Sequence, residues 1–241
     1  MLLIILTFIL AHTPAAAIQA SRPTITFAVG TLNWDDIAPP GTAVVVVSDR
    51  APSERAGSIG YRFMLSGPRA WNEGKAIELY VGFTHISDRR GYRVWWYVFP
   101  ETRPVEGEYK LETTFGTGVI TASARFDAPG TLPRSAWVVA NTVARGEVNA
   151  VWSSVTGAKS YGVAVLGPDD DFVPHDTSSP SPRHTYTTVN SATLLRTSGR
   201  RRVWPHRIEL FAFNIDLTKV PPDLPGQLNV SWKLSPSFEF R

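Results

Sequence analysis

Short runs of strand-forming residues alternate with turn residues along almost the whole chain of 241 residues. In residues 24–29, for example, Ile25, Phe27 and Val29 would share one face of a strand and their neighbours the other. No long segment has helical periodicity, while Pro (19) and Gly (18) are plentiful. Short strands separated by such turns are typical of β-sandwiches and barrels. The chain is therefore predicted to be all-β.

Seven candidate strands between residues 24 and 126 predict a first β-sandwich. They span residues 24–29, 43–47, 61–66, 77–83, 92–99, 108–115 and 119–126. The second is apolar throughout and the fifth is apolar on both faces after Arg93, which suits strands that are buried on both sides. The last two flank Gly116-Thr117-Gly118, and a short link of this kind predicts a hairpin.

A proline- and glycine-containing stretch, residues 127–133, then interrupts the strand pattern and predicts a linker that few contacts cross. We therefore expect a signal segment at 1–20, a β-sandwich of unrecognised family at 21–131 and a second β-sandwich at 132–241. Because the linker is short, the two sandwiches should be held at a restricted angle.

The second half carries a motif of three parts. A strand ending in Trp152 is followed by Val155-Thr156-Gly157-Ala158 and then by the alternating run 160–165. This order resembles strands B and C of a fibronectin type III domain, and residues 208–214 and 227–234 are similar to the family's strands F and G.

The resemblance implies that the second sandwich is fibronectin type III-like, and so immunoglobulin-like in fold. Trp152 would be the core tryptophan, with Tyr161, Val163 and Val165 facing it from the next strand. Domains of this family are binding and spacer modules, so the resemblance also implies recognition through loops and sheet edges.

The N-terminus predicts export. An apolar run, Leu2 to Ala11, precedes Pro14 and a series of small residues, with cleavage after Ala17 or after Ala20 both open. The run is about half of the ~20 residues that span a bilayer, so the chain is not expected to cross a membrane after cleavage. The absence of cysteine excludes a lipidated cysteine, disulfides and thiolate zinc sites. A secreted, periplasmic or cell-surface location follows.

No catalytic constellation is evident in the sequence. None of the histidines lies in a Gly-x-Ser-x-Gly or His-Glu-x-x-His context, so we predict no enzyme, no catalytic residue and no cofactor. The net charge of +3 is far from a nucleic-acid-binding signature. The run Asp169-Asp170-Asp171 could offer oxygens to calcium, but neighbouring residues of an extended chain point in opposite directions. A solvated acidic turn is preferred, no metal site is assigned, and calcium stays open as the alternative.

Two groups of residues are candidates for binding. Arg196, Arg200, Arg201, Arg202 and Arg207 surround Trp204 in a segment expected to be a loop. We call residues 196–207 the basic segment. Such a cluster can bind carboxylates, phosphates or acidic polysaccharide, or it can be a solvated loop that pairs with the three aspartates.

The second group is aromatic. If Trp96 fills the core, Trp95 and Tyr97 would share the opposite face and could stack on sugar rings. The preferred alternative is a central strand with both faces covered.

Together these patterns predict an exported, non-enzymatic structural or interaction module. It would bind a protein or cell-envelope partner through loops, the basic segment and residues 217–226 among them. The alternative is a carbohydrate-binding protein that meets a polysaccharide with Trp95, Tyr97 or Trp71.

Overall fold

The computed structural model describes residues 22–36, 38–49, 62–79, 85–87, 91–115, 118–128, 130–135, 138–144, 147–166, 184–195 and 207–237. Within these ranges the first half contains β1 (Ile25–Asn33), β2 (Gly41–Ser48), β3 (Phe63–Ser66), the short 3-10 helix η1 (Trp71–Gly74), β4 (Ile77–Leu79), β5 (His85–Ser87), β6 (Arg93–Phe99), β7 (Gly107–Phe115) and β8 (Gly118–Phe126). The second half contains β9 (Val138–Ala144), β10 (Glu147–Trp152), β11 (Ser160–Leu166), β12 (Thr185–Thr187), β13 (Ser191–Leu195), β14 (Arg207–Phe213) and β15 (Leu228–Leu234). The all-β prediction is confirmed.

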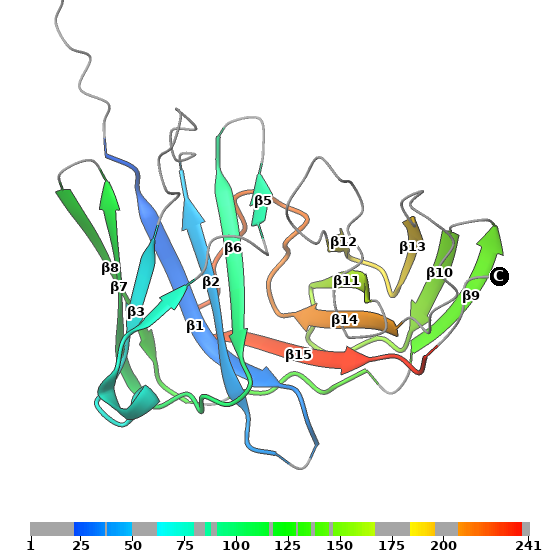
Figure 1. Ribbon diagram of the computed structural model, residues 1–241, viewed down its shortest axis with the longest axis horizontal. Coiled ribbons are helices and arrows are strands. Elements are labelled where there is room, and N and C mark those ends of the chain that lie inside the picture. The colour runs from blue at the N-terminus through cyan, green and yellow to red at the C-terminus, as the bar shows by residue number, and fades with distance from the viewer. Residues whose placement is uncertain are drawn as a thin grey trace, which may run out of the picture.

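The first sandwich has an immunoglobulin-like strand order. Strands β1, β2, β6 and β5 are neighbours in one layer, and β4, β3, β7 and β8 form the other (Figure 1). In the letters of the immunoglobulin fold these layers are A-B-E-D and C′-C-F-G. Strand β7, which corresponds to F, carries Tyr109, whose hydroxyl donates to the carbonyl of Val105 and accepts its N–H, both at 3.0 Å. This is the tyrosine corner of such sandwiches.

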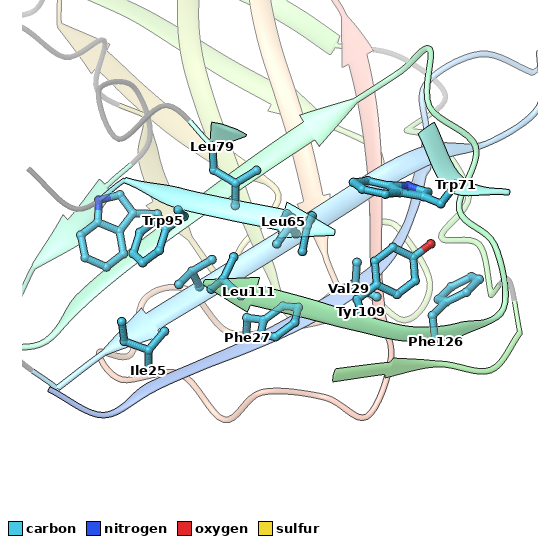
Figure 2. Close-up of a cluster of buried hydrophobic side chains, with 13 residues drawn as sticks. Ile25, Phe27, Val29, Leu65, Trp71, Leu79, Trp95, Tyr109, Leu111 and Phe126 are labelled. Atoms are coloured by element: carbon cyan, nitrogen blue, oxygen red, sulfur yellow. The ribbon is translucent and has the colours of Figure 1, made fainter. Parts of the chain in front are cut away.

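The core of the first sandwich lies between those two layers (Figure 2). It is formed by Ile25, Phe27, Val29, Val44, Val46, Phe63, Leu65, Trp71, Leu79, Trp95, Tyr109, Leu111 and Phe126. Ile25, Phe27 and Val29 share this face as the alternation predicted. The hairpin of β7 and β8 is also confirmed, with Phe115 paired to Gly118. Strand β5 and helix η1 were not predicted.

The second sandwich has the strand order of a fibronectin type III domain. Strands β9, β10 and β13 form the A-B-E layer, and β12, β11, β14 and β15 form the C′-C-F-G layer. Trp152 is fully buried between the layers, and its ring meets that of Tyr161 edge-on with the centroids 5.3 Å apart. Val163 and Val165 lie in the same core. The predicted fibronectin type III-like fold and the role of its core tryptophan are confirmed.

The two sandwiches share one sheet, which the sequence did not predict. Strand β15 pairs in parallel with β1, from Gly30 with Leu228 to Asn33 with Ser231. The result is an eight-stranded sheet in the order β12-β11-β14-β15-β1-β2-β6-β5, in which the red strand β15 runs beside the blue strand β1 (Figure 1). The predicted division at residue 131 stays a prediction.

A further apolar cluster, which we call the junction core, covers the second face of this shared sheet. Its buried members are Ala28, Leu32, Ala43, Val45, Val47, Val94 and Trp96 from the first sandwich and Phe211, Phe213, Ile215, Leu217, Leu228 and Val230 from the second. Alternate residues of β2 therefore face different cores, Val44 and Val46 one and Val45 the other. This explains why that strand is apolar at every central position.

Replacement of Trp152 tests the core of the second sandwich. Trp152→Ala should lower the free energy of unfolding by about 3 to 5 kcal/mol, since it removes a fully buried indole and leaves a cavity. Val151→Ala is the matched control because the adjacent Val151 is 41% exposed, and it should change stability by about 0.5 kcal/mol or less. Urea denaturation followed by circular dichroism measures both, and equal losses in the two variants would contradict the assignment.

Candidate partner-binding surface

Strand register brings several strand ends of the second sandwich together. Leu166, the last residue of β11, pairs with Arg207, the first of β14. In the opposite layer Leu195, the last residue of β13, pairs with Glu147, the first of β10. Since residues 153–159 join the other end of β10 to the start of β11, both pairs lie at the same end of the sandwich.

We call this the charged end, because two charged stretches of sequence are attached to it. Residues 167–183, which include Asp169 to Asp171, follow β11, and residues 196–206 precede β14. The antiparallel pair of Leu166 with Arg207 therefore joins the start of one stretch to the end of the other. Asp169 to Asp171 lie outside the described residues, as do Arg196, Arg200, Arg201, Arg202 and Trp204.

Arg207 is the described member of the basic segment. It is half-buried, and its Nε lies 3.5 Å from the hydroxyl of Ser237. The neighbouring chain is fixed as well, because the N–H of Ser235 donates to the carbonyl of Ile208 at 2.9 Å and the hydroxyl of Ser235 accepts from the N–H of Ile208 at 2.7 Å. The last described residues are therefore bonded to the first two residues of β14.

Trp95 and Tyr97 do not form the exposed aromatic platform that the sequence left open as the alternative. Trp95 is 2% exposed and lies in the first core (Figure 2). Its ring packs edge-on against that of Phe63, with the centroids 5.2 Å apart. Tyr97 is largely buried against the same core. Trp71 is fully buried and donates its indole N–H to the hydroxyl of Thr42 at 3.2 Å. Strand β6 is central and covered on both faces, as the preferred alternative stated.

Residues 217–226 do not form the free loop that the sequence suggested. Leu217 is 1% exposed and belongs to the junction core, and Val220 and Leu224 pack against it. The preceding turn is fixed by Ser160, whose hydroxyl donates to the carbonyl of Ile215 at 2.6 Å and accepts from the N–H of Leu217 at 3.1 Å. This segment is used within the molecule, since its apolar side chains fill the space between the sandwiches.

A buried polar network at the junction was missed by sequence reasoning. The carboxylate of Glu209, a residue only 8% exposed, accepts the indole N–H of Trp232 at 2.9 Å and lies 3.1 Å from Nε2 of His184. Trp96 of the first sandwich packs edge-on against His184 and donates its N–H to the hydroxyl of Tyr186 at 2.7 Å. The one signal in the sequence was Glu209, an acidic residue inside the apolar run 208–213. The same pattern is expected when such a residue faces solvent, so it did not predict the network.

The described residues show neither a metal-binding cluster nor a membrane-spanning helix. These residues contain no cluster of three or more His, Asp or Glu side chains arranged to hold a metal ion. Their single short helix is far from the length that a bilayer crossing requires.

Comparison with known proteins gives no family. No protein-family model matches the sequence, and no curated protein matches it. Among solved structures, the two-domain fibronectin type III segment of chicken tenascin matches at 10% identity, over 82% of this chain and 93% of that one, with a TM-score of 0.29. The immunoglobulin 1-2 module of a Drosophila receptor protein tyrosine phosphatase matches at 12% identity, over 91% and 98%, with a TM-score of 0.37.

A segment of titin also matches, at 12% identity and a TM-score of 0.29 over 88% of this chain, which spans 65% of the titin segment. With TM-scores this low, the fold is defined by the strand order of the two sandwiches and not by these matches. The class that it defines is a pair of immunoglobulin-like sandwiches, the second with the fibronectin type III order.

Two buried tyrosines should make the protein sensitive to high pH. Burial raises the pKa of Tyr97 well above that of a free phenol, and burial together with the charge of Glu209 raises the pKa of Tyr186 despite the hydrogen bond from Trp96. Below a pH of about 10 both phenols are protonated whether the chain is folded or not, so their contribution to stability is constant. Above it the unfolded chain releases protons that the folded chain retains, and the free energy of unfolding should fall.

Alkaline titration checks this expectation. Ultraviolet absorbance of tyrosinate should show Tyr97 and Tyr186 ionising only as circular dichroism reports unfolding. Tyr97→Phe removes one of the two groups and should reduce the fall of stability with pH. Complete tyrosine ionisation in a chain that is still folded would show that neither phenol is held in its neutral form.

Proposed function

We propose that this chain is an exported, non-enzymatic interaction module that binds an anionic protein or cell-envelope partner at the charged end of its second sandwich. The observation that carries the proposal is that the basic segment follows β13 in one layer and leads into β14 in the other, at the end of the sandwich where β11 also finishes. Binding segments are commonly attached in this way to the strands of a rigid scaffold.

The chemistry of the segment supports an anionic partner. Guanidinium groups form paired hydrogen bonds with carboxylates and phosphates, and the segment holds five arginines within twelve positions, 196 to 207. A partner carrying several acidic groups would satisfy more of them than an isolated anion. Acidic side chains of a protein and acidic envelope polymers both have this chemistry.

The described surface offers little to an apolar partner. The large apolar side chains that are exposed on it are Met64, Val119, Val151 and Val189, which belong to four different segments. Scattered single residues of this kind are normal on a soluble protein and do not form a docking patch. The aromatic side chains that suggested sugar stacking, Trp71, Trp95 and Tyr97, lie in or against the first core and do not offer an open ring face to a sugar.

Location outside the cytoplasm is part of the proposal. It rests on the signal-like sequence of residues 1–20, which lie outside the described residues, and on the immunoglobulin-like class of both sandwiches. A fold without cysteine suits any compartment, because its stability does not depend on disulfide formation.

Removal of two arginines tests the proposal. The full mature chain should bind immobilised heparin and poly-L-glutamate, and Arg200→Ala/Arg201→Ala should weaken binding about tenfold, which corresponds to about 1.4 kcal/mol. Affinity should fall as sodium chloride is raised, since charge–charge contacts are screened. Surface plasmon resonance measures both effects.

The control variant is Arg69→Ala/Arg103→Ala. Both of these arginines are exposed on the first sandwich, so the double variant loses the same charge far from the basic segment in sequence. It should bind both polymers as the unchanged chain does. Equal losses in the two double variants would show that only net charge matters, and an unchanged chain that binds neither polymer would refute the anionic partner.

A further inference from the structure

We infer that the two sandwiches form a single interlocked unit, in which β15 of the second sandwich closes the edge of the first, so that loosening either sandwich loosens both. Tandem sandwiches joined only by a linker would unfold independently. The interlock does not depend on the identity of any partner, and therefore goes beyond the proposed function.

The first part of the interlock is the edge of β1. This strand pairs along one side with β2, from Ile25 with Ser48 to Leu32 with Gly41. Its other side, from Gly30 to Asn33, pairs with β15. Without β15, this part of β1 would be an unpaired sheet edge, with N–H and C=O groups lacking the partners that they have in the shared sheet. The second sandwich thus completes the backbone hydrogen bonding of the first.

The second part is the close approach of the two strands. A Cβ atom placed on Gly30 would overlap with the backbone carbonyl of Leu228. A backbone carbonyl within a strand cannot move aside as the end of a flexible side chain can. The pairing of β1 with β15 therefore depends on the missing side chain at position 30.

The third part is the linker together with Arg134, which follows it, since the two are bonded to both sandwiches. Nε of Arg134 donates to the carbonyl of Trp232 in β15 at 3.1 Å, and its Nη1 lies 3.0 Å from the carboxylate of Asp36. The side-chain amide of Asn33, at the end of β1, donates to the carbonyl of Leu132 at 3.0 Å. The linker cannot swing without breaking contacts on both sides.

The fourth part is the junction core. Trp96 belongs to the first sandwich, yet its ring packs edge-on against Phe211 and Phe213 of the second, with centroid distances of 4.6 and 5.2 Å. Its indole N–H is bonded to Tyr186 of the second sandwich. Separation of the sandwiches would expose this indole and the apolar residues around it to water, which is unfavourable.

The interlock has a consequence for binding. A ligand that binds only the folded form of one sandwich stabilises whatever unfolds together with it. A partner held at the second sandwich would therefore also stabilise the first, although it touches none of its residues.

Hydrogen exchange of the full chain, followed by mass spectrometry, tests the interlock. Gly30→Ala should raise the exchange rates of β7, in the first sandwich, and β10, in the second, by a similar factor of about ten or more. Gly226→Ala is the matched control, because a Cβ at position 226 has no atom within 4 Å, and it should leave both rates unchanged. Faster exchange confined to one sandwich would overturn the inference.

A second pair of variants decides the matter if Gly30→Ala does not fold. Trp96→Phe and Tyr186→Phe each remove one partner of the hydrogen bond between the sandwiches. In a double-mutant cycle measured by urea denaturation, a single transition and a non-additive effect support coupling across the junction. Two separate transitions, or effects that simply add, would overturn it.

Discussion

Parallel pairing joins β1 and β15, two strands from opposite ends of the chain, and so makes one layer of each sandwich part of a single sheet. Most other features of the molecule follow from this pairing. It lets the second face of β1, β2 and β6 be covered by the neighbouring sandwich. It also requires a glycine at position 30, where a side chain would meet the backbone of β15. A contact of only four residue pairs thus joins two sandwiches that each have a core of their own.

Burial on both faces explains where the aromatic residues are. Trp95 and Trp96 are neighbours in β6 and point into different cores, the first sandwich's and the junction's. An aromatic pair on an outer strand would have left one ring in water. Here neither ring is available to a ligand.

The polar network of Glu209, His184 and Trp232 lies at the margin of the junction core. A carboxylate removed from water is costly unless its oxygens are satisfied, and here both oxygens have a nitrogen partner within 3.1 Å. Such a network constrains how β12, β14 and β15 pack, since a shift of any one would leave a buried polar atom without its partner. It therefore adds directional hydrogen bonds to the non-directional apolar contacts of the junction core.

Alternation of apolar residues, which is a local property of the chain, was enough to predict the all-β class, most strands and the hairpin after Phe115. The burial of Trp152 was implied by the resemblance of its surroundings to fibronectin type III domains. The basic segment could be named from composition alone, and its role stays a prediction. The shared sheet, the junction core and the inward use of residues 217–226 were decided only by tertiary structure. A strand's sequence shows that both of its faces are apolar but not what covers them, because pairing between β1 and β15 joins residues about 200 positions apart.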